Sequence, residues 1–324
     1  MEALYNPPTL QEAILYFAVP ENCLKYLVVR RAEWQNGVTC PTCGSDKVGF
    51  LKNQLRWQCS ARHPKRQFSV KVGTIFEDSP LGLDKWLPCV WLITNAKNGI
   101  SSYEVGRALG VTQKTAWFML HRVRLAHQGK DGGKLGGSGN GVEVDETFIG
   151  GKARNMHADV KARKIQGRRG PEGKAIVAAV LERGGKVRAK VIDKRKKKDL
   201  QALVRENVEI GSALYSDALK SYEGLGGEFV HQVIDHAVEY VRENVHTNGM
   251  ENFWSLLKRG INGTYVSVEP YHLFRYVDEQ AFRFNNRTNM NDGDRFDLAI
   301  RQIVGKRLTY SELIGSGRVA SEIN

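Results

Sequence analysis

Two cysteine-containing segments have the spacing of metal-binding knuckles. The first is Cys40-x2-Cys43 in the run CPTCG, and the second is Cys59-x3-His63 in the run CSARH. Thiolate and imidazole ligands at such spacings are typical of tetrahedral structural zinc sites. Because metal binding is coupled to folding, such a site can stabilise a module too small to bury its own core. We therefore predict a structural Zn2+ ion held by these four side chains.

The spacing alone does not decide which residue is the fourth zinc ligand. A second C-x2-C-type knuckle would put a ligand at Arg62, so His63 requires a loop that is one residue longer, or the ligand lies elsewhere. The remaining cysteines, Cys23 and Cys89, have apolar neighbours and are predicted to be core thiols. Five cysteines in a chain without secretory features do not indicate a disulfide framework.

The run NGMENFWSLLKR, from Asn248 to Arg259, places a carboxylate and two cations on one predicted helix. The plainest interpretation is helix capping, in which Asn248 caps the helix and Glu251 reaches back to its free N–H groups. The functional alternative is that Glu251 binds a metal ion while Lys258 and Arg259 contact phosphate. Phe253 and its apolar neighbours would then dock the helix onto a sheet.

Two aspartates lie in predicted strands of the second half. Asp145 is at the centre of the alternating run VEVDETFIGGK, and Asp217 ends the short strand in SALYSD. The predicted order is strand, strand, strand, helix, strand, strand, helix, which favours an α/β domain with a mixed central sheet. If the two aspartate strands are neighbours and the last helix packs across the sheet, Asp145, Asp217 and Glu251 converge. Glu146 points to the other face of its strand and is not predicted to bind metal.

The first half of the chain has a different character. Short helices are predicted over the first 30 or so residues, followed by a turn-rich stretch with short strands that contains the zinc ligands. The run YEVGRALGVTQKTAWFMLHRV then has the pattern of a helix-turn-helix, with Lys114 at the start of the second helix. An ordinary helical hairpin is the alternative. The glycine-rich run 129–141 is predicted to be a flexible linker.

The charge of the chain favours a polyanionic partner. The formal net charge is +13, and the cations gather at 161–169, 193–199 and 256–260. Such clusters favour contact with the phosphates of DNA or RNA over a uniformly solvated basic surface. No run of about 18 uncharged apolar residues occurs, and the N-terminus lacks the pattern of a signal peptide. We therefore expect a cytoplasmic protein that does not bind membranes.

Several blocks resemble one known family. The runs VEVDETFIGGK, YSDALKSY and HTNGMENFWSLLKRGINGTYVSVEPYHLFRYVDEQAFRFNNR are similar to insertion-sequence transposases of the ISXO-type group. The preceding segment, CPTCG to WQCSARHPKRQFSVKVGTIFEDS, resembles the zinc ribbon of the same group. The resemblance covers roughly residues 35–290 with its blocks in the expected order. It implies an RNase H-like catalytic domain in a bacterial or archaeal DDE-type DNA transposase.

The resemblance also implies roles for individual residues. Asp145 matches the first acidic position and Asp217 the second, while the third falls in HTNGMENFW, where members carry an acid or a neutral residue. Glu251 suits the acidic form by its spacing from Asp217, and Asn248, one helical turn earlier, is the alternative. Three such carboxylates would hold Mg2+ or Mn2+, because hard cations prefer oxygen ligands and their charge offsets the repulsion between carboxylates. A pair of such ions can activate the attacking oxygen and stabilise the leaving oxygen at a phosphodiester.

We therefore expect a multi-domain protein that binds terminal inverted repeats, cleaves DNA and joins the cut end to target DNA. Lys114, Lys258 and Arg259 are candidate DNA contacts, and the resemblance implies a homodimer or larger assembly on DNA. Two alternatives are a non-catalytic DNA-binding protein derived from a transposase, and a nuclease acting on RNA or hybrids. The expected divisions are an N-terminal helical segment (1–34), the zinc ribbon (35–78), the helix-turn-helix-like region (79–128), the linker (129–141), the RNase H-like domain (142–290) and a C-terminal tail (291–324).

Overall fold

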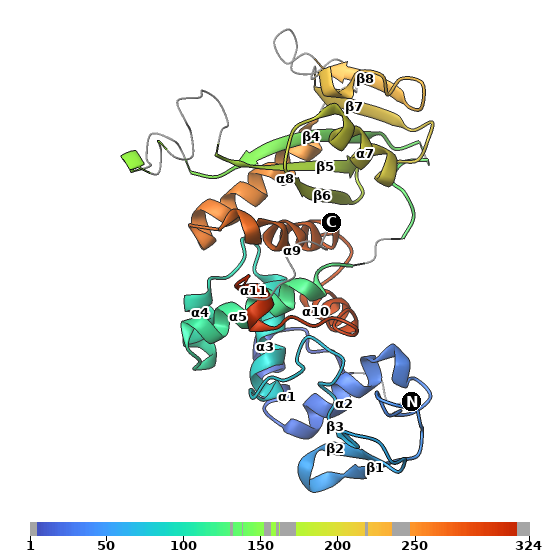
Figure 1. Ribbon diagram of the computed structural model, residues 1–324, viewed down its shortest axis with the longest axis vertical. Helices are drawn as coiled ribbons and strands as arrows, with labels where there is room; N and C mark the ends of the chain where they lie inside the picture. Colours follow the sequence, from blue (N-terminus) through green and yellow to red (C-terminus); the bar gives the residue numbers. More distant parts are fainter. Residues whose placement is uncertain are drawn as a thin grey trace. The chain divides into compact units, whose positions relative to one another are not determined.

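The structure is a computed structural model of the 324-residue chain (Figure 1). It describes residues 5–129, 132–137, 139–151, 157–159, 162, 173–217, 220–234 and 247–315. The chain divides into two compact units. Unit 1 combines Met1–Gly129 with Thr288–Asn324, and unit 2 is Lys130–Arg287. In the order of the chain, unit 2 is therefore inserted between two separated parts of unit 1.

Unit 1 begins with the short helices that the sequence predicts. Helix α1 (Leu10–Phe17) starts with a capping box in which the side chains of Thr9 and Glu12 bind each other's backbone N–H groups. Helix α2 (Pro20–Arg30) has proline at its first position, where no intrahelical N–H is needed. A 3-10 turn, η1 (Ala32–Trp34), follows and leads into the ribbon.

The ribbon is a small antiparallel sheet with strand order β1-β2-β3. Its elements are β1 (Val48–Leu51), η2 (Lys52–Gln54), β2 (Arg56–Cys59) and β3 (Gln67–Phe68). Trp57 is the cross-strand partner of Phe68, and their rings stack with centroids 5.9 Å apart. Trp34 packs against Trp57 at 5.4 Å. These few aromatic rings are a modest apolar core, as expected for a module that needs a metal ion.

Three further helices of unit 1 confirm the helical prediction for residues 79–128. They are α3 (Leu83–Asn95), α4 (Ser102–Leu109) and α5 (Gln113–Ala126). Gly110 ends α4 in the left-handed region, with φ 62°, which allows the sharp turn into α5. Gly106 lets the turn approach closely, because a Cβ atom there would lie 3.0 Å from the Val111 carbonyl oxygen. This local geometry is that of a helix-turn-helix.

The C-terminal segment, for which the sequence analysis offers no motif, contributes two helices to unit 1. They are α10 (Asp292–Arg301) and the short α11 (Tyr310–Leu313). Phe296 of α10 packs against Phe17 and Tyr26, with ring centroids 5.7 and 5.6 Å apart. The Ile75 N–H also donates to the Ile303 carbonyl at 3.2 Å. Helix α10 and Ile303 therefore belong to the same core as the N-terminal helices.

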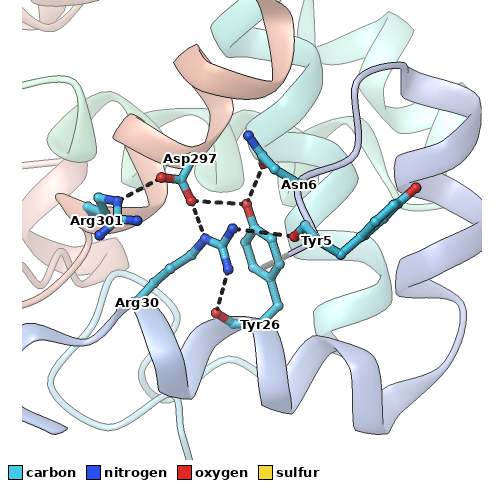
Figure 2. A network of polar contacts seen from close by, with 6 residues as sticks. All are labelled: Tyr5, Asn6, Tyr26, Arg30, Asp297 and Arg301. Carbon is cyan, nitrogen blue, oxygen red and sulfur yellow. Dashed lines mark hydrogen bonds and ion pairs between the residues drawn. The ribbon is translucent and has the colours of Figure 1, made fainter. Parts of the chain in front are cut away.

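A buried polar network joins α10 to α2 (Figure 2). Arg30 is almost fully buried and forms an ion pair with Asp297, which also accepts a hydrogen bond from Arg301 at 2.7 Å. The Tyr26 hydroxyl lies 3.0 Å from Asn6 Oδ1, to which it donates. Since an unpaired buried guanidinium would be costly, this network fixes where α10 docks.

Unit 2 is built on a five-stranded sheet with the order β6-β5-β4-β7-β8. Strand β4 pairs antiparallel with β5 and parallel with β7, while β5–β6 is antiparallel and β7–β8 is parallel. The predicted order of strands and helices is confirmed. The elements are β4 (Val142–Ile149), β5 (Ala175–Glu182), β6 (Val187–Ile192), α7 (Lys197–Asn207), β7 (Ala213–Asp217), η4 (Lys220–Tyr222), β8 (Val230–Ile234), α8 (Asn248–Arg259), the π-helical turn η5 (Gly260–Tyr265), η6 (Pro270–His272) and α9 (Leu273–Asn285).

Alternate residues of the central strands face two separate cores. Val142 and Val144 of β4 pack with Leu200 and its neighbours on the α7 side of the sheet. Ile149 of β4 packs with α8 and α9 on the other side of the sheet, together with Val177, Ala179 and Leu181 of β5. A mixed sheet with helices on both faces is consistent with the predicted RNase H-like fold. Consequently Glu143 and Asp145 share the face that α8 covers, and Glu146 points toward α7.

The glycine-rich linker differs from its prediction over the residues described. Leu135 is buried, its N–H donates to the Asn207 carbonyl at 2.7 Å, and its own carbonyl accepts from Glu209. The segment is held against α7 because Leu135, an apolar residue in a glycine-rich run, is buried in the core on that side of the sheet.

The described part of the chain contains no helix with the length and hydropathy needed to span a bilayer.

Candidate functional site

The four predicted zinc ligands come together in the ribbon. Cys40 and Cys43 lie on the turn before β1, Cys59 ends β2, and His63 lies in the loop that leads to β3. Gly44, with φ 73°, closes the first knuckle, where its N–H donates to the Cys40 carbonyl at 2.8 Å. The ligand atoms of the four residues all lie within 4.8 Å of one another.

The distances fit a tetrahedral zinc ion. The sulfurs of Cys43 and Cys59 are 3.7 Å apart, and the Cys40 sulfur is 3.5 Å from His63 Nε2. A tetrahedron with Zn–S bonds of about 2.3 Å and Zn–N bonds of about 2.0 Å requires separations of about 3.8 Å and about 3.5 Å. The donor set and these two separations therefore fit Zn2+.

The longer loop brings His63, and not Arg62, to the fourth corner of the cluster. Arg62 is exposed, whereas the Nδ1 atom of His63 lies 2.6 Å from the Pro64 carbonyl oxygen. A proton on Nδ1 would be donated to that carbonyl, which leaves the Nε2 lone pair pointing at the thiolates. The sequence left this position open, and the structure shows that the extra residue in the loop is compatible with it.

The two buried cysteines of the cluster differ in their pKa: burial raises that of Cys59, whereas Cys40 is shifted toward the thiolate. Burial tends to raise the pKa of Cys40, but hydrogen bonds from the backbone at Cys43 and Thr42 outweigh it and lower that pKa to about 7. By contrast, burial raises the pKa of Cys23 and of Cys89 to about 12. Both of these thiols are buried, which confirms the prediction that they are core residues.

Asp145 lies at the centre of β4 and is partly exposed on the face covered by α8. Its Oδ1 accepts a hydrogen bond from the Glu146 N–H at 2.8 Å, and its Oδ2 accepts from Trp254 Nε1 at 2.9 Å. Asp145 is therefore oriented by hydrogen bonds from the protein. Its carboxylate oxygens are hard ligands of the kind that divalent cations bind.

Asp217 is adjacent to Asp145 in the backbone of the sheet. Strands β4 and β7 are parallel, and Val144 pairs with Ser216, so the next residues along the two strands are Asp145 and Asp217. Neighbouring strands lie about 4.8 Å apart. The side chain of Asp217 lies outside what the structure describes.

The helix that carries Glu251 does not begin as predicted. Asn248 is the first residue of α8 and does not cap it; the cap position is Thr247, whose side chain makes no capping hydrogen bond. Instead, the N–H of Met250 donates to the carboxylate of Glu143 at 2.8 Å. The capping group comes from a neighbouring strand, which a local sequence pattern could not reveal. Asn248 and Glu251 are both exposed on the first turn.

Glu251 and Asn248 lie at different angles from Trp254 around α8. Residues of an α-helix are offset by about 100°, so Glu251 lies about 60° around the axis from Trp254 and Asn248 about 120°. Around the helix axis, Glu251 is therefore nearer than Asn248 to the residue that contacts Asp145. Lys258 is on the same side as Glu251 and is exposed; Arg259 is exposed as well.

Lys114, the third basic candidate, lies at the start of α5, directly after the turn of the helix-turn-helix. It is exposed, with its Nζ atom 4.9 Å from the ring centroid of Tyr310. In a helix-turn-helix, residues at the N-terminus of the second helix contact base edges. Of the predicted basic clusters, most of 161–169 lies outside the described residues, and the exposed lysines of 193–199 flank the start of α7.

Two residues at this site were not predicted to act there. Glu143 was part of the strand pattern only, and Trp254 was expected only to dock α8 onto the sheet. No signal in the sequence pointed to Glu143, because a glutamate at an alternating position of a strand is ordinarily exposed. For Trp254, the indole N–H needed a partner once the ring was buried.

Comparisons with known proteins agree with these features. Residues 134–285 match the family model of the ISXO2-like transposase domain, and residues 21–62 match that of the transposase zinc-ribbon domain. An uncharacterized protein in transposable element ISH50 of Halobacterium salinarum is 27% identical over 247 residues, which cover 72% of this chain and 81% of that protein. An uncharacterized transposase-like protein of Haemophilus influenzae is 33% identical over 88 residues, 27% of this chain and 71% of that protein. With its zinc ribbon, its mixed sheet and these relatives, the chain belongs to the ISXO2-like transposase family.

Proposed function

We propose that this protein is an active insertion-sequence transposase that cleaves DNA at the ends of its element and joins those ends to target DNA. The observation that carries the proposal is the register of β4 and β7, which makes Asp145 and Asp217 neighbours on parallel strands. Helix α8 lies on the same face as Asp145, and its Trp254 contacts that carboxylate. Glu251 supplies the third acidic group from the adjoining side of the helix, with Asn248 as the alternative.

Asp145, Asp217 and Glu251 would hold the divalent cations, Mg2+ or Mn2+. The donor set fits, since all three offer hard carboxylate oxygens and Asp145 is partly exposed. When bound, such ions lower the pKa of the attacking hydroxyl and stabilise the charge on the leaving oxygen of a phosphodiester. The residues of this chain supply the orientation: the Glu146 N–H and the Trp254 indole fix the Asp145 oxygens before substrate arrives.

The basic residues give the site its nucleic-acid partner. Lys258 and Arg259 lie in the last turn of α8 and would contact phosphates that pass the carboxylates. Lys114, at the N-terminus of the second helix of the helix-turn-helix, would contact the terminal inverted repeats. We infer that cleavage takes place in an assembly of at least two copies, because each element has two ends.

The zinc ribbon has a structural part in this function. Cys40, Cys43, Cys59 and His63 would hold Zn2+, and the ion would keep the short strands and the aromatic core of the ribbon folded. A closed set of four protein ligands leaves no open position for substrate. We therefore assign the ribbon to DNA binding and the carboxylates to chemistry.

A cleavage and strand-transfer assay tests the proposal. The substrate is DNA from the flanks of the gene, incubated with the full chain and Mg2+ or Mn2+, and the variants are Asp145→Asn and Asp217→Asn. Both should reduce cleavage at least about a thousand-fold, as expected for losing several kcal/mol of transition-state stabilisation. Asp193→Asn, which removes the same charge from an exposed position in unit 2, is the control and should cleave normally.

Three other results would point elsewhere. Binding of the end DNA without any metal-dependent cleavage by the wild-type protein would make it a DNA-binding protein without catalytic function. Preferential cleavage of RNA or RNA–DNA hybrids in a competition assay would make it a nuclease of another class. Unchanged cleavage by Asp217→Asn would remove Asp217 from the mechanism.

A further inference from the structure

We propose that Glu143 is a positioning residue, which sets the place of α8 and thereby of the third acidic group beside Asp145. The effect on metal binding rests on the proposed function, whereas the contacts of Glu143 do not depend on it. The structure places the acidic side chains of β4 in different environments. Asp145 is partly exposed on the α8 face, and Glu146 on the α7 face accepts hydrogen bonds from Tyr222 at 2.8 Å and Arg195 at 3.0 Å.

Glu143 is different from both, since it is fully buried on the same face as Asp145. Its Oε1 accepts from Arg183 Nε at 3.1 Å, and its Oε2 accepts from the Met250 N–H at 2.8 Å. Met250 is the third residue of α8, where the backbone N–H has no partner inside the helix. A carboxylate at this end of a helix is also favoured by the helix dipole. Glu143 is thus the capping group of α8, supplied from β4.

The start of α8 is fitted to this contact. The residue before Met250 is Gly249, and a Cβ atom there would lie 2.9 Å from Glu143 Oε2 and 2.9 Å from Leu181 Cδ2. Glycine lowers helix propensity, so its presence in the first turn has a reason in packing. Only a residue without a side chain allows the helix to approach the buried carboxylate this closely.

Glu143 and Asp145 together fasten the helix to the strand at two points. Met250 contacts Glu143 and Trp254 contacts Asp145, so the contacts are four residues apart on α8 and two apart on β4. Four helical residues rise about 6 Å and two strand residues about 6.6 Å, which means that the two spacings match. The helix is therefore held in register with the strand. Glu251 lies between the two contacts, and its distance from Asp145 depends on both.

Glu143 itself is not a metal ligand in this arrangement. Both of its oxygens are engaged, its charge is compensated by Arg183 and the helix terminus, and it is buried. Its removal should leave the carboxylates that bind metal in the chain but displace them from one another. A positioning group of this kind changes metal affinity and activity by about 10- to 100-fold in known metal sites.

The experiment uses Glu143→Ala, Glu143→Gln and Gly249→Ala in the full-length chain. Controls are Glu206→Gln, which removes an exposed charge from α7, and Gly263→Ala, where an added Cβ meets no atom within 4 Å. The first readout is the affinity for Mn2+, measured by calorimetry on zinc-loaded protein without DNA. The second is the 19F resonance of Trp254 in protein labelled with 5-fluorotryptophan, assigned with Trp254→Phe. Cleavage of end DNA as a function of Mn2+ is measured in parallel.

We expect Glu143→Ala and Gly249→Ala to shift the Trp254 resonance and to weaken Mn2+ binding at least about tenfold. Glu143→Gln should recover part of the loss, since its amide oxygen can still accept the Met250 N–H while the ion pair with Arg183 is lost. It also keeps the shape of the side chain, which separates positioning from misfolding. Both controls should behave as wild type.

Two results would overturn the inference. One is a Trp254 resonance and a Mn2+ affinity in Glu143→Ala and Gly249→Ala that equal those of the wild type. The other is complete loss of Mn2+ binding in Glu143→Gln, equal to that in Asp145→Asn, which would make Glu143 a ligand. Failure of the proposed function looks different: the wild type would not cleave end DNA, while the response of the Trp254 resonance to Glu143 would still test the positioning role.

Discussion

The ribbon and the carboxylate site of unit 2 are built in opposite ways. The four ribbon ligands lie between residues 40 and 63 of the chain, on two knuckles separated by one hairpin. The acidic residues at 145, 217 and 251 come from two strands and a helix that are distant in the chain. In the ribbon, metal binding is coupled to the folding of the module. In unit 2 these positions are set by the sheet and by the two cores that cover it.

This difference decides what supports each site. The ribbon has only a small aromatic core of Trp34, Trp57 and Phe68, so the ion has to contribute to folding. Unit 2 has a large core on each face of its sheet, so the metal ions of the proposed function would not be needed for its folding. The first site should therefore lose its fold without metal, and the second should lose only its activity.

The largest expected effect is the loss of zinc from the ribbon. Cys59→Ser removes a buried ligand at the end of β2, and the ribbon should then unfold, because structural zinc sites contribute on the order of 10 kcal/mol to folding. Zinc content by mass spectrometry should fall to zero. The emission of Trp57 and Trp34 should move to the red as their rings become hydrated.

Cys23→Ala is the matched control for that variant. It replaces a buried thiol of α2 that is outside the ligand cluster, so zinc content and ribbon fluorescence should be retained. The environment of Trp254 in unit 2 should be unaffected in both variants. A Cys59→Ser protein with a folded, zinc-loaded ribbon would contradict the assignment of the ligands.

The second-largest effect concerns an ion pair in unit 1 whose partners are far apart in the sequence. Asp297→Ala leaves the buried Arg30 without its ion-pair partner, which should destabilise the helices of unit 1 by about 3 kcal/mol. Five of the six tryptophans precede residue 130, so tryptophan fluorescence follows the thermal unfolding of this unit. Zinc content should not change, since the cluster contains no residue of α10.

An exposed ion pair provides the comparison for Asp297. Asp78→Asn removes the partner of Arg307, and both side chains are more than half exposed, so the midpoint of unfolding should stay close to that of the wild type. Equal destabilisation by the two variants would mean that the network in Figure 2 does not fix α10.

The difference between a site built from local sequence and one built from distant elements also explains what the sequence could predict. Ligand spacing in the ribbon is a local pattern, so the three cysteines could be named in advance, with His63 as the candidate for the fourth position. The order of strands and helices in unit 2 followed from periodicity, and the family resemblance supplied the sheet. The network of Arg30 with Asp297 could not be predicted, because neither residue lies in a pattern and 267 positions separate them.

The contacts around Asp145 were also beyond the reach of the sequence. Asn248 and Glu251 have the spacing of a capping box, and the local pattern favoured that interpretation. The cap is in fact Glu143, which comes from more than 100 positions earlier in the chain. Which of two capping groups prevails depends on how the helix packs on the sheet. That packing is a tertiary property, and the same holds for the bond between Trp254 and Asp145.

A third, smaller effect should separate orientation from packing at the carboxylate site. Trp254→Phe keeps most of the ring but removes the donor to Asp145 Oδ2, a hydrogen bond to a charged group worth about 2 kcal/mol. Cleavage at limiting Mn2+ should fall by about tenfold or slightly more. Phe253→Leu, a change in the adjacent buried residue of α8, should lower the stability of unit 2 without altering its Mn2+ requirement. If Trp254→Phe left the Mn2+ requirement unchanged while Phe253→Leu altered it, the hydrogen bond between Trp254 and Asp145 would have no part in orienting the site.

The smallest effect should appear at the β7–β8 edge of unit 2, next to Asp217. The Nε2 atom of His231 lies 2.8 Å from the buried Ser216 hydroxyl, and burial lowers the pKa of His231. The unfolded chain has a histidine pKa of about 6.5, so the contribution of neutral His231 to stability is complete above that pH and is lost as the pH falls through the lower folded value. Urea unfolding followed at the Trp254 19F resonance should show a modest loss of stability between pH 7 and pH 5. His231→Gln, which can still hydrogen-bond Ser216 but cannot titrate, should remove the part of this loss that the zinc ligands and the carboxylates do not cause. An unchanged pH dependence in that variant would show that this edge of the sheet does not respond to protons.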